Sequence, residues 1–247
     1  MNQPPSPASP WRLQVFESLP STSDLCRTLA EAGEPAHLAI LARRQTQGRG
    51  TQGRLWTSPP GNLFLSALLR PHERMRDVGQ WALLAAVAVA DAVAGLLPDP
   101  AALRLKWPND LLLGDAKLAG ILTEASADPA GNLAWLVIGM GVNVATAPAL
   151  ADRVTVSLAQ VTASPPDPLT LARAVLDRLL HWQQARLVAG FAAIRAAWVA
   201  RGPALGALLT LRQGGRAFAG HFAGLGDDGS LLLATGGRVH AFAAGEV

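Results

Sequence analysis

The stretch RLKWPNDLLLGDAKLAGILTE, residues 104–124, contains three short apolar runs separated by turn-forming residues. Runs of this length, bounded by Pro-Asn-Asp and Gly-Asp sequences, are typical of β-strands rather than helices. We expect strands at residues 103–107, 111–113 and 118–124, and the apolar run at 133–138 predicts a fourth. Four strands this close in sequence predict one sheet.

The sequence around this stretch predicts further strands and the helices that cover them. Residues 11–19 alternate only weakly between apolar and polar side chains, whereas the apolar runs at 37–42 and 61–69 each predict a strand. Residues 21–29 predict a helix entered through Ser and Thr capping residues, and residues 168–200 have the apolar spacing of helices. The predicted fold class is therefore α+β, a mixed β-sheet packed by helices.

The most apolar segment, residues 78–97, is long enough to span a membrane. It contains Gln80 and Asp91, however, and is rich in alanine rather than leucine, which favours a buried helix. From residue 208 onward, short apolar runs alternate with Gly-Gly and Asp-Asp-Gly turns, the pattern of a small antiparallel barrel. We therefore predict a flexible tail at 1–10, a main domain at 11–201 and a small module at 202–247.

Composition restricts the class of protein. The net charge of +3 is too small to indicate a nucleic-acid partner. The single cysteine, Cys26, cannot form an internal disulfide, and no Cys/His spacing indicates a zinc site. The first residues lack the positive start and apolar run of a signal peptide. We expect a cytoplasmic globular protein.

The two lysines of the chain, Lys106 and Lys117, lie in one short stretch, although the chain has 19 arginines. A lysine kept under such a bias indicates a need for a compact ammonium with three donors, which a planar guanidinium does not imitate. Chance placement of two residues is the alternative interpretation.

The segment GRGTQGR, residues 48–54, followed by Trp56, is a candidate anion-binding loop. Its glycines let the backbone approach a ligand, while Arg49 and Arg54 can bind phosphate or carboxylate oxygens. The spacing matches neither a Walker A loop nor a dinucleotide fingerprint. The alternative is a solvated, flexible hairpin.

Two further pairs of residues have a structural and a functional interpretation. Asn109 and Asp110 follow a proline and serve either as turn formers or in adenine recognition and magnesium or charge positioning. Gly139 and Gly141 mark a bulge or a strand end, or they let a flat ligand lie against a strand.

Four blocks, PSTSD (20–24), RRQTQGRGTQGRLW (43–56), residues 104–124 and VIGMGVN (137–143), resemble in order and spacing the catalytic signature of the biotin protein ligases. The resemblance covers residues 11–247. It implies a catalytic domain of the class II synthetase-like, biotin/lipoate ligase type and an SH3-like carboxy-terminal β-barrel.

The resemblance also implies roles for individual residues. It places biotin against Ser21, Thr22, Ser23, Gln45, Arg49, Gly50, Thr51, Lys117, Gly120, Gly139 and Gly141. It places ATP or the adenylate against Arg49, Thr51, Arg54, Trp56, Asn109, Lys117 and Asn143. The implied catalytic residues are Lys117, Arg49, Arg54 and Asp110.

The chemistry that the resemblance implies is activation of biotin by ATP, followed by transfer to a lysine of a carboxylase carrier domain. Lys117 and the loop arginines would stabilise charge at the α-phosphate, with Mg²⁺ held by the ATP phosphates and Asp110 as a candidate ligand of the ion. Asp110 is also a candidate to orient the attacking carrier lysine. We expect the loop at 48–54 to be mobile without ligand, and a homodimer is compatible with the sequence.

Three departures and two alternatives accompany this resemblance. Thr51 stands where several relatives have arginine, so we expect leakier retention of the adenylate. The chain ends at Val247, where some relatives continue with a basic segment, and no helix-turn-helix precedes Trp11, so we expect no DNA-binding domain and no DNA partner. The alternatives are a lipoate protein ligase and a noncatalytic binding protein for nucleic acid, which a steep salt dependence would reveal.

Overall fold

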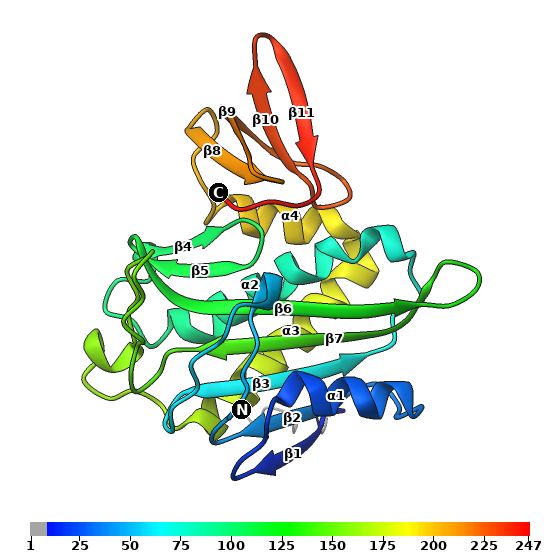
Figure 1. Cartoon of the computed structure of the whole chain (residues 1–247), viewed down its shortest axis with the longest axis vertical. Coiled ribbons are helices and arrows are strands. Elements are labelled where there is room, and N and C mark those ends of the chain that lie inside the picture. The colour runs from blue at the N-terminus through cyan, green and yellow to red at the C-terminus, as the bar shows by residue number, and fades with distance from the viewer. Residues whose placement is uncertain (1–8) are drawn as a thin grey trace, which may run out of the picture.

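A computed structural model describes residues 9–247, so residues 1–8 of the expected tail lie outside the described part of the chain. Its main feature is a seven-stranded mixed sheet with the order β1-β2-β3-β7-β6-β5-β4 (Figure 1). The pair β1 and β2 is parallel, and every other neighbouring pair is antiparallel. The strands are Arg12–Phe16 (β1), Leu38–Ala42 (β2), Leu63–Leu69 (β3), Leu103–Lys106 (β4), Asp110–Leu113 (β5), Ala116–Ala127 (β6) and Leu133–Val142 (β7).

Helices cover both faces of this sheet. Helix α1, Thr22–Glu31, packs on one face, where Cys26 and Ala30 join a small apolar cluster with residues of β2, β3 and β7. Helices α2, Gly79–Ala94, and α3, Pro168–Ala189, lie on the other face over a much larger core. Burial of apolar side chains on both faces is the main force that holds the layers together.

The alternation of side chains along β7 gives its two faces different characters. Leu136, Ile138 and Met140 point into the large core, whereas Val137 faces the α1 side. Gly139 and Gly141 follow Val137 at the same spacing, so the α1 side of the sheet has no side chains at these two positions. A Cβ on Gly139 would lie 2.6 Å from the Ser23 hydroxyl, so the missing side chain lets the start of α1 lie close to the sheet.

A β-bulge changes the same pattern in β6. Leu111 pairs with Ala119 and Leu112 pairs with Lys117, so Leu118 is an extra residue in the strand. Leu118 and Ala119 are both buried in the large core. The bulge thereby turns Lys117 to the α1 side, where unbroken alternation would have put it in the core.

The carboxy-terminal part forms a second, four-stranded antiparallel sheet with the order β11-β10-β9-β8. Its strands are Leu208–Gln213 (β8), Arg216–Leu225 (β9), Leu231–Thr235 (β10) and Arg238–Phe242 (β11). The last residues return to β8, because Glu246 exchanges two backbone hydrogen bonds with Arg212. This closure agrees with the small antiparallel barrel that the turn pattern predicts.

The second sheet packs on helix α4, Phe191–Val199, and on the amino-terminal end of α2 (Figure 1). Trp198 of α4 contacts Phe222 of β9, and the Trp107 indole donates to the backbone carbonyl of Gly229. One continuous core therefore extends through both sheets. The predicted domain boundary at residue 202 stays a prediction.

The helix expected at 78–97 is α2, and its environment explains its apolar sequence. Within residues 9–247, one helical stretch, Met75–Ala94, is long and apolar enough to cross a membrane, but 67% of its most apolar window is buried inside the protein. Burial of this kind is typical of a core helix. The helical region at 168–200 is divided into α3 and α4 by Gly190, whose φ of 65° interrupts the helix.

Several expected elements have different ends or positions in the structure. Strands β6 and β7 extend to Ala127 and Val142, well beyond the predicted ends. The interpretation of Gly139 and Gly141 as a bulge is wrong, because both pair in regular register with β3 and β6, whereas Gly141 does lie next to Val142, the last residue of β7. Within the described residues 9–247 there are also four short 3-10 helices: Thr51–Gly53, Met75–Asp77, Pro100–Ala102 and Leu158–Gln160.

Candidate active site

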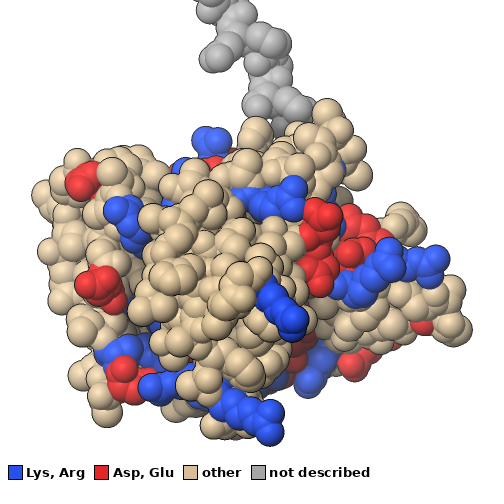
Figure 2. Space-filling model, turned by 90° about the horizontal axis from the view of Figure 1, so that it is seen from above, with Lys and Arg blue, Asp and Glu red and all other residues tan. Residues whose placement is uncertain are grey.

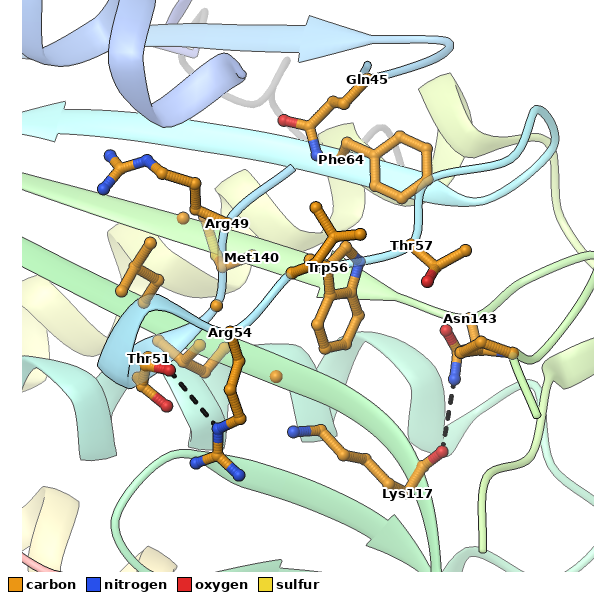
Figure 3. Close-up of a pocket in the computed structure, with 18 of the residues that line it drawn as sticks. Gln45, Arg49, Thr51, Arg54, Trp56, Thr57, Phe64, Lys117, Met140 and Asn143 are labelled. Carbon is orange, nitrogen blue, oxygen red and sulfur yellow. Dashed lines mark hydrogen bonds between the residues drawn. The ribbon is translucent and has the colours of Figure 1, made fainter. Parts of the chain in front are cut away.

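A pocket of about 300 Å³ opens on the α1 side of the large sheet. The predicted site residues other than Asp110 all line it, together with residues that the sequence did not single out (Figure 3). The expected ones are Ser21, Thr22, Ser23, Gln45, Arg49, Gly50, Thr51, Arg54, Trp56, Asn109, Lys117, Gly120, Gly139, Gly141 and Asn143. Segments far apart in sequence thus converge on one cavity.

One end of the pocket is a neutral hydrogen-bonding site at the start of α1. Ser21 caps the helix, since its hydroxyl accepts from the Asp24 backbone N–H at 3.3 Å. The Gln45 side-chain oxygen accepts from the backbone N–H and the hydroxyl of Thr22 at 2.8 and 3.1 Å. Buried Ser66 of β3 donates to Thr22 at 2.8 Å and lies 3.1 Å from the Ser23 hydroxyl. The hydrogen-bond donors and acceptors at the start of α1 are thus held in fixed positions at this end of the pocket.

The segment between β2 and β3 crosses the pocket and is held by a network around Gln45. The Gln45 amide donates to Ser58 at 3.0 Å, and Ser58 donates to the Trp56 carbonyl at 2.8 Å. Gly48 lies inside this network, where a Cβ would come within 2.5 Å of both Ser58 and the Trp56 carbonyl. Glycine at this position is therefore a requirement of close packing.

The Trp56 indole lies against the glycine-bearing faces of β6 and β7. A Cβ on Gly141 would come within 2.5 Å of the ring, and one on Gly120 within 2.9 Å. The Lys117 ammonium lies 5.4 Å from the centre of the ring, in cation–π range. In this conformation, two of the four glycines that the resemblance assigns to biotin, Gly120 and Gly141, make room for an indole.

Arg49 is not directed at the cationic end of the pocket. Its guanidinium donates to both Glu124 oxygens at 2.9 and 2.7 Å and lies 2.7 Å from an Asp24 oxygen. It thereby links the loop to β6 and α1. The geometry makes Arg49 a clamp on the loop, and a direct role at phosphate stays a prediction.

Lys117 and Asp110 form a close ion pair, with Nζ and Oδ1 2.6 Å apart and both side chains largely buried. Burial lowers the pKa of the Lys117 ammonium, and the charges of Arg153 and Arg54 lower it further, whereas Asp110 raises it. The net pKa is below the ordinary value of 10.5. Asp110 is the one predicted site residue outside the pocket wall, and its oxygen reaches the site through this lysine.

A second group of charges surrounds this pair at the cationic end of the pocket. Arg153 lies 3.6 Å from Asp110 and 3.0 Å from Glu246, and Glu246 in turn lies 3.1 Å from Arg54. Arg153 also pairs with exposed Asp152 at 2.7 Å. The chain therefore pre-arranges three cations, Lys117, Arg54 and Arg153, around carboxylates that neutralise them.

The two predicted asparagines hold backbone segments together. The Asn109 amide donates to the Ile121 carbonyl at 2.7 Å. The Asn143 amide donates to the carbonyls of Lys117 and Val156 at 3.3 and 3.2 Å. These bonds fix the strands that carry the glycines and Lys117, and contact of either amide with adenine stays a prediction.

The residues of the pocket fit a ligand with hydrogen-bond acceptors. Within residues 9–247, Trp56 Nε1 and Arg49 Nε are buried without a hydrogen-bond partner. Such donors are rare in native proteins and suit a ligand that accepts from them. The described residues bring no three His, Cys, Asp or Glu side chains together as metal ligands.

Sequence reasoning missed Ser66, Arg153 and Glu246. Ser66 lies in an apolar strand, and its contact with Thr22 depends on how β3 meets α1. Arg153 belongs to a segment without a motif, but its neighbours Val154 and Val156 bond to the backbone of Lys117. Glu246 lies at the end of the predicted small module, where no motif marks it.

The fold and the pocket define a ligand-binding α+β domain, whose site is neutral and hydrogen-bonding at one end and cationic at the other. Residues 15–143 match the sequence profile of the Biotin/lipoate A/B protein ligase family. The chain belongs to this family.

Individual relatives extend over most of the chain. It is 40% identical over 200 residues to the biotin--[acetyl-CoA-carboxylase] ligase of Paracoccus denitrificans, which covers 78% of this chain and 82% of the relative. It is 34% identical over 249 residues to the ligase of the same name from Mycobacterium tuberculosis, with 97% and 90% covered. The biotin protein ligase of Aquifex aeolicus, solved in complex with biotin and ATP, is similar with a TM-score of 0.80 and 27% identity, covering 95% of this chain and 96% of that one.

The contact between Gly141 and Trp56 predicts the effect of one added methyl group. In Gly141→Ala the new Cβ would lie 2.5 Å from the indole, so the ring must leave its place on β7 and become more exposed to water. We expect a red shift of the tryptophan fluorescence that disappears in a Trp56→Phe background. Gly95→Ala is the control, since nothing lies within 4 Å of a Cβ there. A red shift that persists without Trp56 would contradict the assignment.

Proposed function

We propose that this enzyme is a biotin--[biotin carboxyl carrier protein] ligase, which converts biotin and ATP to biotinyl-5'-AMP and transfers biotin to a lysine of the carrier. The observation that carries the proposal is the arrangement of one pocket. Its neutral set around Gln45 and Thr22 lies at one end, and Lys117 and Arg54 lie at the other (Figure 3). That order matches biotin's neutral ureido ring at one end and its carboxylate beside the ATP phosphates at the other.

In the first half-reaction, the biotin carboxylate attacks the α-phosphorus of ATP and pyrophosphate leaves. Negative charge on the nonbridging phosphate oxygens rises in the transition state. Lys117 is the residue best placed to stabilise it, because its ammonium is buried, faces the pocket and is fixed by Asp110. Arg54 adds a second positive charge at the same end.

In the second half-reaction, the amine of the carrier lysine attacks the biotinyl carbonyl, and AMP leaves with the bridging oxygen. The attacking amine must first lose a proton, and Asp110 is the carboxylate closest to the reacting end. Because Asp110 is already bonded to Lys117, it acts on the carrier only if that pair opens. Its positioning of Lys117 is the better supported role.

Magnesium would arrive with the ATP phosphates and would neutralise part of their charge. Carboxylates are the ligands that Mg²⁺ uses in proteins, usually one or two together with phosphate oxygens. Asp110, Asp152 and Glu246 are the carboxylates at the cationic end, and each is paired with a cation of the protein, which agrees with a magnesium ion held chiefly by its nucleotide.

The alternatives are less well supported. A lipoate ligase would present an apolar dithiolane to this end of the pocket, where Thr22, Ser23 and Gln45 offer hydrogen bonds instead. A nucleic-acid partner would favour a continuous basic surface. On the face in Figure 2, positive and negative side chains are interspersed.

Other features of the proposal come from the resemblance and the relatives. We propose the carrier domain of a carboxylase as the macromolecular substrate and the cytoplasm as the compartment. The proposed catalytic domain spans 11–201 and the SH3-like domain spans 202–247. Thr51 in the loop is proposed to retain the adenylate less tightly than an arginine would. A homodimer remains compatible with this function.

Removal of the Lys117 ammonium tests the proposal. We expect wild type to transfer labelled biotin to a carboxylase carrier domain with ATP and magnesium, and Lys117→Ala to lose about 10²–10³-fold in rate, as for loss of one transition-state donor. Arg43→Ala is a control at an exposed ion pair outside the pocket. Lack of transfer and of biotin-dependent pyrophosphate release by folded wild type would refute the proposal.

The ion pair of Lys117 predicts a pH effect. The Lys117 pKa is already lowered, and Asp110 opposes this shift, so Asp110→Asn lowers the pKa further. The ammonium is lost as pH rises through its pKa, so the alkaline fall of biotin-dependent pyrophosphate release should begin at a lower pH in Asp110→Asn. Asp227→Asn, at an exposed carboxylate outside both cavities, should keep the wild-type profile. An unchanged alkaline limb in Asp110→Asn would show that Asp110 does not set this pKa.

A further inference from the structure

A second cavity, of about 210 Å³, lies beside the main pocket. Its walls are the loop that carries Thr51 and Arg54, the β4–β5 turn and the carboxy-terminal segment at 243–246. Thr51, Arg54 and Asn109 line both cavities, so the two adjoin at the cationic end of the site. The volume is well above the roughly 10–15 Å³ that one water requires, so a small polyanion is a reasonable occupant.

Lys106 lines this second cavity at the end of β4. It is the other lysine of the chain, and the function described above gives it no role. It pairs in register with Asp110 of β5, which places it beside the partner of Lys117. Each of the two lysines therefore lies in the wall of one of two adjoining cavities.

Within the described part of the chain, the carboxylates in the wall of the second cavity form ion pairs, whereas its lysine does not. Asp110 is 2.6 Å from Lys117, and Glu246 is 3.1 Å from Arg54 and 3.0 Å from Arg153. Among the salt bridges of residues 9–247, none includes Lys106. Its ammonium is thus a cation in a cavity wall whose carboxylates are already engaged elsewhere. Such a group suits an anionic ligand.

The direction of the first half-reaction relates this cavity to the main pocket. In displacement at phosphorus, the attacking and leaving oxygens lie roughly in line. Biotin would approach from the end of the pocket at Gln45, and Figure 3 shows the Arg54 side chain extending away from that end. The leaving group would therefore depart toward Arg54, which is also a wall of the second cavity.

We propose that the second cavity receives the pyrophosphate leaving group and that Lys106 binds it, an inference that rests on the proposed function. A biotin carboxylate oxygen bonds to the α-phosphorus as the bond from that phosphorus to the bridging oxygen breaks. The bridging oxygen and its electron pair leave with pyrophosphate, and no proton is transferred. Lys106 and Arg54 bind the charge that appears on this group, and Lys106 takes no part in the later transfer to the carrier.

Lys106→Met tests this assignment, and Arg104→Met is its matched control. Arg104 lies on the same strand, is exposed and lines neither cavity. The Arg104→Met substitution removes one positive charge, as Lys106→Met does. Three rates are measured: ATP formation from biotinyl-5'-AMP and added pyrophosphate, biotin-dependent pyrophosphate release, and transfer of biotin from preformed biotinyl-5'-AMP to the carrier domain. Calorimetry with magnesium pyrophosphate alone measures binding without turnover.

We expect Lys106→Met to lower kcat/KM for pyrophosphate in ATP formation by about tenfold or more, as for loss of a charge-assisted bond. Its binding of magnesium pyrophosphate should weaken likewise. Transfer from preformed adenylate should stay within about twofold of wild type, which also shows that the variant is folded, and Arg104→Met should match wild type throughout.

If Lys106→Met had the same kcat/KM for pyrophosphate in ATP formation as wild type, the assignment would be overturned. An equal loss in the transfer step would also overturn it, since the residue would then act on the whole site. If wild type forms no biotinyl-5'-AMP, the proposed function itself fails, which is a different result from an active wild type with an unaltered variant.

Discussion

The bulge at Leu118 is the constraint on which the site depends. One extra residue in β6 lets Leu118 and Ala119 both enter the core and turns Lys117 to the opposite face, beside Gly120. The displaced backbone of Lys117 is satisfied by the segment that follows β7, through bonds with Val154 and Val156. A lysine at the edge of an apolar core is thereby held rigidly toward a pocket.

The same backbone bonds bring Arg153 close to the lysine and complete an electrostatic site. Three cations lie at one end of the pocket, and carboxylates on β5 and on the last residues of the chain balance them. An anionic ligand would replace protein carboxylates as the partner of these cations. Preorganised charge of this kind is effective in catalysis because it requires little rearrangement during the reaction.

Local sequence patterns predicted which segments form strands and helices better than they predicted how these elements pair and pack. The short apolar runs around 104–124 correctly indicated strands, and Ser21 was recognised as a helix cap. The bulge could not be predicted, because its cause is the fit of Leu118 and Ala119 into a core built by distant helices. The regular pairing of Gly139 and Gly141 depends in the same way on the neighbouring strands β3 and β6.

The candidate site shows a similar division. The resemblance selected residues that do converge on one pocket, since motifs preserve residue types at fixed spacing. It did not predict their partners. Arg49 is directed to Asp24 and Glu124, and Arg153 and Glu246 reach the site from segments without a motif. Long-range ion pairs follow from the tertiary structure and leave no periodic signal in the sequence.

The most direct test follows one oxygen atom. Biotin labelled with ¹⁸O in its carboxylate is incubated with the protein, ATP, magnesium and a carboxylase carrier domain, and the AMP released is analysed by mass spectrometry. If biotin is activated through its own carboxylate, one ¹⁸O appears in AMP and none in pyrophosphate. Biotinylated carrier with unlabelled AMP would contradict attack of the carboxylate on the α-phosphorus, and with it the role assigned to the cationic end of the pocket.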